Sequence, residues 1–144
     1  MARYVTKVRT TRSAADVFAF MADLRNLVQW DPGVRSAVMV EGEAGTASAV
    51  VDVVVSGTTL RYHTTSFDPP TSVVVRAESS TLISIDRIDV EDQGDTRVVT
   101  YDADLQLKGV LKVAGPVLRL AFGRIGDRAA AGLRRVLDGQ DVPK

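Results

Sequence analysis

The feature that most constrains this fold is a long region in which apolar and polar side chains alternate. In residues 98–108, VVTYDADLQLK, Val99 and every second residue after it are apolar, and the residues between them are polar. A period of two is typical of a β-strand with one covered and one solvated face. Residues 34–108 are rich in Val, Ile, Thr and Tyr and are interrupted by short groups of turn residues. We therefore expect an antiparallel meander.

The turns predict which side chains share the covered face of this meander. Folding at DQGD puts Asp86 opposite Tyr101, and folding at Gly57-Thr58 puts Val53 opposite Tyr62. Because a slip of one residue would reverse the faces of a strand, the agreement of successive hairpins supports one continuous curved sheet. With YVTKVRT near the N-terminus, the sheet has about seven strands. The predicted inward residues are Val38, Val40, Val51, Val53, Val55, Leu60, Tyr62, Val73, Val75, Leu82, Ile88, Val99, Tyr101 and Leu105.

Helical segments precede and follow the meander. Residues 115–139 carry apolar side chains at helical spacing, which predicts one long C-terminal helix with Ile125 on its buried stripe. Its Gly123, Gly126 and Gly132 mark either a bend or a close approach to the sheet. Ser13 is a candidate N-cap for a short helix, and a second short helix ends before Trp30-Asp31-Pro32-Gly33. The expected α+β architecture is a helix-grip fold, in which a curved sheet wraps around the long helix and two short helices lie between strands 1 and 2.

Several segments resemble one superfamily, in the same order along the chain. VFAFMADLRNLVQWDPGV, YHTTSFDPPTSVVVRAES, SIDRIDV and residues 96–137 are similar to the SRPBCC superfamily, within a bacterial branch of polyketide cyclase/dehydrase-like proteins. The superfamily also includes START domains and birch-pollen-allergen-like proteins. The resemblance implies a single domain over residues 1–144 with a cavity between sheet and helix. It implies the binding of lipids, polyketides or other apolar molecules, and in some members cyclisation or dehydration.

Asp86 and Tyr101 are the candidates for chemistry, because a carboxyl group on an apolar face has a raised pKa and a nearby tyrosine hydroxyl can polarise a ligand carbonyl. The alternative is a buried polar pair that stiffens the sheet and anchors a ligand. No catalytic residue is firmly assigned. The predicted cavity residues are Trp30, Val51, Tyr62, Val75, Ser84, Asp86, Tyr101, Leu105, Leu118 and Phe122. Small side chains such as Ala47, Ala77 and Ala103 are expected to leave room for the ligand.

Composition restricts the function further. The chain has no cysteine and a single histidine, His63, which excludes thiolate chemistry and makes a serine–histidine–aspartate triad improbable. No metal and no nucleotide cofactor is indicated. The net charge of +0 is unlike that of a nucleic-acid-binding protein. The absence of a long apolar run predicts no stable membrane insertion, and we expect a soluble cytoplasmic protein.

Three functions stay open at this point. The leading hypothesis is binding or transport of a hydrophobic small molecule between the sheet and the C-terminal helix. The second is a cyclase or dehydratase that works without metal or nucleotide cofactor and uses Asp86 and Tyr101 as an acid–base pair. The third is a non-catalytic interaction protein with a filled core, such as a homodimer formed through Val50, Val54 and Val74 on the outer face.

Overall fold

A computed structural model describes residues 2–55, 57–108 and 115–141, with the backbone alone described for residues 2, 115–122, 140 and 141. In chain order the elements are β1 (Ala2–Thr10), α1 (Ala14–Ala22), the 3-10 helix η1 (Leu24–Asn26), α2 (Leu27–Trp30), β2 (Val34–Glu41), β3 (Val50–Val55), β4 (Thr58–Asp68), β5 (Ser72–Glu78), β6 (Leu82–Asp92), β7 (Arg97–Leu107), α3 (Gly115–Leu137) and β8 (Gln140–Asp141). None of the helices in these ranges is sufficiently long and apolar to cross a membrane.

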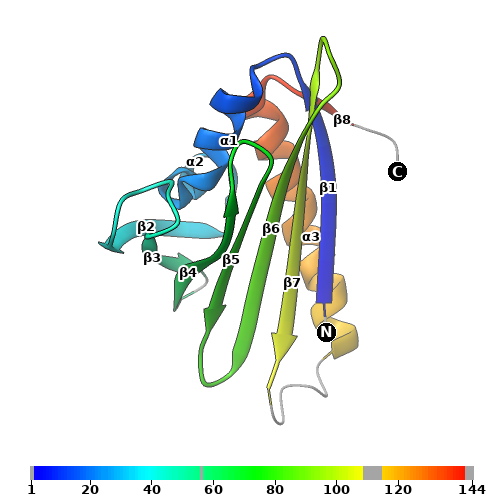
Figure 1. Cartoon of the computed structure of the whole chain (residues 1–144). Helices are drawn as coiled ribbons and strands as arrows, with labels where there is room; N and C mark the ends of the chain where they lie inside the picture. The colour runs from blue at the N-terminus through cyan, green and yellow to red at the C-terminus, as the bar shows by residue number, and fades with distance from the viewer. Residues whose placement is uncertain (1, 56, 109–114, 142–144) are drawn as a thin grey trace.

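The strands form one open antiparallel sheet in the order β2-β3-β4-β5-β6-β7-β1-β8, in which β8 contributes only two residues. Figure 1 shows α3 running along the β7–β1 side, whereas α1 and α2 lie above the other half of the sheet. The β2–β3 end curls away from the direction of β6 and β7. The predicted helix-grip architecture is confirmed, including the two short helices between β1 and β2.

The predicted faces of most strands are correct, but several predicted partners are wrong by two residues. Asp86 pairs with Ala103 and not with Tyr101, and Val53 pairs with Leu60 and not with Tyr62. A shift of two positions keeps each side chain on its face, because the side-chain period of a strand is two. The inward faces of β3 to β7 are therefore as expected.

The predicted face of β2 is wrong. Val38 and Val40 are 60% and 44% exposed, and Ala37 and Met39 pack against the core instead. Two causes are visible. The connection after β2 extends to Ala49 and is folded by its own hydrogen bonds, and β2 is irregular between Val34 and Ser36 and between Met39 and Glu41. Each irregularity adds an unpaired residue and reverses the faces of the residues beyond it. Ala47, expected to line the sheet, is exposed in this connection.

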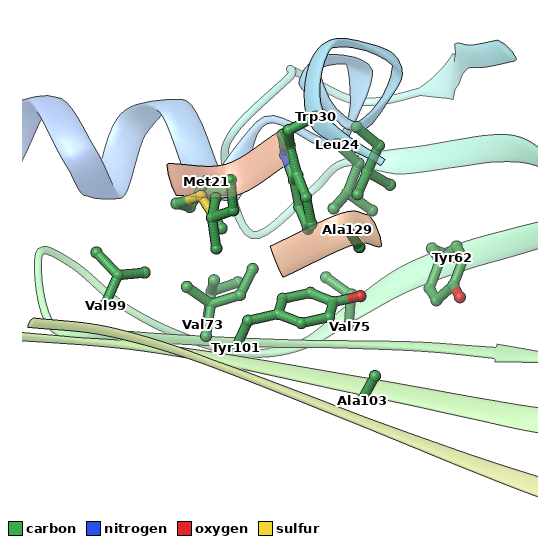
Figure 2. Packing of buried hydrophobic residues seen from close by; sticks show 14 of the residues in the cluster. Met21, Leu24, Trp30, Tyr62, Val73, Val75, Val99, Tyr101, Ala103 and Ala129 are labelled. Atoms are coloured by element: carbon green, nitrogen blue, oxygen red, sulfur yellow. The ribbon is translucent and has the colours of Figure 1, made fainter. Parts of the chain in front are cut away.

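The helices close the core over the concave face. Ser13 caps α1 as predicted, since its side chain accepts a hydrogen bond from the backbone N–H of Asp16 at 3.2 Å. Phe18 of α1 packs on Phe67 of β4 with ring centroids 5.6 Å apart. Trp30 of α2 meets Tyr101 of β7 edge-on, with centroids 5.2 Å apart. Figure 2 shows these layers, with Trp30 between the helices and the tyrosine ring.

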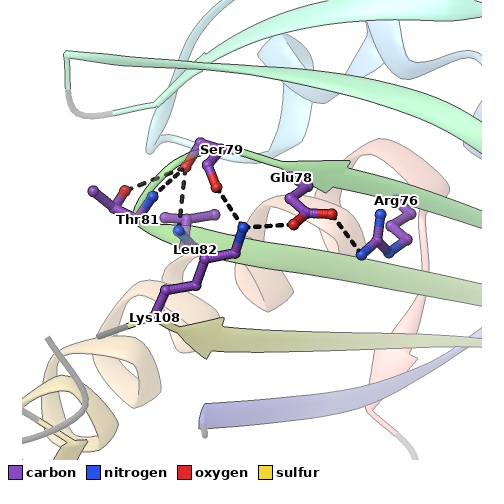
Figure 3. A network of polar contacts seen from close by, with 6 residues as sticks. All are labelled: Arg76, Glu78, Ser79, Thr81, Leu82 and Lys108. Carbon is purple, nitrogen blue, oxygen red and sulfur yellow. Dashed lines mark hydrogen bonds and ion pairs between the residues drawn. The ribbon is translucent and has the colours of Figure 1, made fainter. Parts of the chain in front are cut away.

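The outer face of the sheet is covered by ion pairs rather than by another layer. Arg61 pairs with Asp52 and Arg87 pairs with Asp89. Figure 3 shows the end of this face, where Arg76 and Lys108 both contact Glu78. Arg61, Arg76 and Arg87 lie on this outer face, and each is paired with a carboxylate. Exposed pairs of this kind each contribute at most about 1 kcal/mol, so the fold depends on the inner face.

Two of the three glycines of α3 mark close approaches. A Cβ atom at Gly132 would overlap with the backbone carbonyl of Trp30, and one at Gly126 would overlap with the ring of Tyr4. At Gly123 a Cβ atom would meet no described atom within 4 Å. Ile125, predicted on the buried stripe, is 43% exposed. It is exposed because α3 turns Gly126 and Ala129, and not Ile125, toward β1 and α2.

A matched pair of substitutions tests this packing. Gly132→Ala is expected to lower the free energy of unfolding by about 1–3 kcal/mol, because the added methyl group forces α3 away from Trp30. Gly123→Ala, the same change on an unobstructed part of the helix, is expected to raise it by up to about 1 kcal/mol through helix propensity. Urea unfolding followed by circular dichroism measures both. Equal effects of the two substitutions would contradict the close approach.

Candidate functional site

A cavity of about 310 Å³ lies between the concave face of the sheet and the helices. Its lining residues come from β2, β3, β4, β6 and β7 on the sheet side and from α2, α3 and the turn after α2 on the other. They are Leu27, Asp31, Val34, Val53, Val55, Thr58, Leu60, Tyr62, Leu82, Ser84, Asp86, Tyr101, Ala103, Leu105 and Ile125. The cavity exists because α3 packs mainly on β1 and α2 and does not extend over β3 to β5.

The strongest polar feature of the cavity is a carboxyl–tyrosine pair. Asp86 and Tyr101 are only 7% and 8% exposed, and the Tyr101 hydroxyl donates a hydrogen bond to Asp86 Oδ2 at 2.8 Å. Asp86 lies diagonally across the β6–β7 ladder from Tyr101, and the long tyrosine side chain spans the offset. Burial raises the pKa of Asp86 to about 7, although the hydrogen bond from Tyr101 acts in the opposite direction.

A second polar pair lies beside the first. The hydroxyl groups of Tyr62 and Ser84 are 2.7 Å apart and share a hydrogen bond. Burial and the nearby Asp86 carboxyl raise the pKa of Tyr62 well above that of a free tyrosine, and burial does the same for the pKa of Tyr101. Both phenols are therefore neutral hydrogen-bond donors and acceptors at physiological pH.

Sequence analysis missed Asp31, which brings a second carboxyl group to the same cavity. Its Oδ1 accepts a hydrogen bond from the backbone N–H of Gly33 at 2.9 Å, and burial raises its pKa. In the sequence, the segment Trp30-Asp31-Pro32-Gly33 indicates only the end of a helix. The feature of the sequence that could have indicated a cavity residue is the position of Asp31, directly after a tryptophan expected to line the cavity.

The predicted site residues fall into three groups. Tyr62, Ser84, Asp86, Tyr101 and Leu105 are all brought to the cavity wall. Trp30 is buried in the core and lines a small adjoining pocket with Asp31, Tyr101 and Ala103.

Two of the other four predicted residues, Val51 and Val75, are not among the described residues that line this cavity. Both are only 1–2% exposed and lie in the packed core. Leu118 and Phe122 belong to the part of α3 whose side chains lie outside the described residues. Within the described ranges, no three His, Cys, Asp or Glu side chains are grouped to hold a metal ion.

The chain matches a known protein family along nearly its whole length. A family model described as polyketide cyclase / dehydrase and lipid transport matches residues 1–138. The chain belongs to this family. The match places it in the SRPBCC superfamily, as the sequence resemblance predicted. A search of curated proteins gave no match.

Solved structures show the same fold at low sequence identity. A START superfamily protein from Mycobacterium smegmatis has a TM-score of 0.76 at 14% identity, over 96% of this chain and 98% of that one. Major latex-like protein 151 from Panax ginseng has a TM-score of 0.66 at 13% identity, over 99% and 98%. A norcoclaurine synthase mutant from Thalictrum, in complex with a transition-state analogue, has a TM-score of 0.56 at 14% identity, over 88% and 92%. Because proteins that share a fold differ in function, the role of the polar groups in this cavity depends on this chain's own residues.

The buried carboxyl predicts how stability depends on pH. The folded protein keeps a proton on Asp86 up to about pH 7, whereas the unfolded chain releases it near pH 3.8, because burial raises the pKa only in the folded state. Protons therefore favour the folded state within this window. The free energy of unfolding is expected to fall as pH rises from about 4 to 7, by up to about 1.4 kcal/mol per pH unit.

Asp31, whose pKa is also raised by burial, adds to the slope in the same direction. Asp86→Asn is expected to flatten the slope and to be more stable than the wild type at pH 8, since it removes a buried charge. Asp89→Asn, on the outer face of the same strand, is the control and is expected to keep the slope. Urea unfolding across this pH range measures it, and a wild-type stability that rises toward pH 7 would contradict the buried, protonated carboxyl.

Proposed function

We propose that this protein binds a hydrophobic small molecule in the cavity between its sheet and its helices. The observation that carries the proposal is the cavity of about 310 Å³, whose wall is mostly Val, Leu, Ile and Ala. Small-molecule sites typically measure roughly 300–1,000 Å³ and combine an apolar wall with a few polar groups. The family's lipid transport description supports the same class of function.

Local packing supports an open site rather than a filled core. Ala103 and Ser84 stand on adjacent strands at the centre of the wall, where larger side chains would occupy the space. Ile125 of α3 is at the cavity and partly exposed, which places the opening next to this helix. In an interaction protein with a filled core, we would expect larger side chains at Ala103 and Ser84.

A cyclase or dehydratase is the second candidate, because Asp86 has a pKa of about 7 and a tyrosine hydroxyl within hydrogen-bond distance. Such a carboxyl group can accept or donate a proton near neutral pH. If a substrate is found among cyclisable polyketides, Asp86→Asn is expected to lower kcat at least about a hundredfold while the substrate still binds. Unchanged turnover would leave binding as the function of the pair.

Filling the cavity tests the leading proposal. Ala103→Leu adds three carbon atoms to the cavity wall, at the residue that pairs with Asp86 on the neighbouring strand. The substitution is expected to weaken binding of the apolar fluorescent probe N-phenyl-1-naphthylamine at least tenfold, because it reduces the space for a guest. Ala131→Leu, the same substitution on the exposed side of α3, is the control and is expected to bind like the wild type. Fluorescence titration of the probe measures both affinities. A wild-type protein that does not bind the probe, or equal affinities in all three proteins, would contradict the cavity as the site.

A further inference from the structure

When Asp86 is ionised, the cavity contains a carboxylate oxygen to which no described residue donates a hydrogen bond. Asp86 accepts a hydrogen bond from Tyr101 on Oδ2, and no residue in the described part of the chain donates to its Oδ1. Asp86 is nevertheless only 7% exposed and lines the cavity. Below about pH 7 the carboxyl group of Asp86 carries a proton, and when this proton leaves, Oδ1 becomes an acceptor without a donor. The ionised form therefore favours a guest that supplies a donor.

A second carboxyl group, that of Asp31, adds further acceptor oxygens to the cavity. Asp31 reaches the same cavity from the turn after α2, and only its Oδ1 is bonded by the backbone N–H of Gly33. The negative charge of Asp31 also acts unfavourably on the ionised form of Asp86. Two carboxyl groups around one apolar space create a negative potential wherever either of them ionises.

No cation of the described chain offsets this potential inside the cavity. None of the lining residues is Lys, Arg or His. The arginines on the other side of the same strands, Arg61 and Arg87, are paired with Asp52 and Asp89. The rings of Tyr62 and Tyr101 add electron-rich surfaces, which attract cations.

From this arrangement we infer that the preferred guest is an amphiphilic amine, whose apolar body fills the cavity and whose protonated nitrogen bonds to Asp86 Oδ1. The inference rests on the proposed function and names the chemical class of its ligand. A charge-assisted hydrogen bond to a carboxylate is roughly twice as strong as a neutral one. An anionic head group would face two carboxyl groups without a counterion, and an alcohol would gain only the weaker bond.

A bond between the protonated nitrogen of the guest and Asp86 makes the binding affinity depend on pH. The groups that act on Asp86 are Asp31 from the turn after α2, Tyr101 and Asp102 from β7, and Tyr62 from β4. On the described side chains of α3, the residues at the cavity are uncharged. Since an alkylamine stays protonated to about pH 10, raising the pH from 6 to 8.5 ionises Asp86 while the guest keeps its charge. The affinity for an amine is expected to rise by up to about tenfold over this range, whereas that for an alcohol is not.

A head-group series on one chain length tests the inference. Octylamine, octanol and octanoate are titrated into the protein by isothermal calorimetry at pH 6 and pH 8.5. At pH 8.5 octylamine is expected to bind at least tenfold more tightly than octanol, with octanoate the weakest. Asp86→Asn is expected to reduce the preference for the amine to less than threefold and to abolish its pH dependence. Asp89→Asn, which removes an outer-face carboxyl from the same strand, is expected to keep both.

The outcomes separate the two proposals. If none of the three compounds binds, the cavity does not take apolar guests and the proposed function is overturned together with the inference. If octanol or octanoate binds as tightly as octylamine, the function stands and the preference for amines is overturned. A preference that survives Asp86→Asn would overturn the assignment of the nitrogen to this carboxyl. The pH series on the wild type keeps the test valid if the variant does not fold.

Discussion

The position of Trp30 determines how the layers of this protein meet. Its ring packs edge-on against Tyr101 of the sheet, and its backbone carbonyl lies where only a glycine, Gly132, fits on α3. Arg135 of α3 also donates to the carbonyl oxygen of the adjacent Gln29 at 3.0 Å. One short helix thus connects the sheet to the long helix on one side. On the other side, Thr10 of β1 donates to the carbonyl oxygen of Leu137. The helix is held over β1, and a cavity remains between it and residues of β3, β4, β6 and β7.

Two polar groups of the cavity, Asp86 and Tyr101, lie on the longest ladder of the sheet. They belong to β6 and β7, which pair along their whole length, and Tyr101 also packs against Trp30. Burial among these packed residues keeps the carboxyl group of Asp86 protonated up to about pH 7. The free energy of unfolding falls when a rise in pH removes this proton. The same contacts that hold the layers therefore place one carboxyl oxygen against the cavity, where a guest can reach it.

Sequence patterns predicted the fold well because they depend on periodicity. Alternation assigns faces, and a partner error of two residues leaves a face unchanged, so Asp86 and Tyr101 reached the same wall although they do not pair directly. The prediction for Val38 failed because β2 carries irregularities that alternation cannot reveal. Asp31 was missed because its place depends on how the turn after α2 folds back toward the sheet, which is a tertiary property. Likewise, the glycines of α3 could be interpreted only once their neighbours were known.

The two carboxyl groups act differently from the rest of the site. An apolar wall binds any guest of suitable size, because burial of hydrocarbon surface is not directional. Selection among such guests then depends on the few buried polar groups that a wrong head group would leave unpaired. In this cavity the phenol and serine hydroxyls already have one another or Asp86 as partners. The open acceptor on ionised Asp86, with Asp31 nearby and no described cation at the wall, is thus the feature that we propose discriminates between guests.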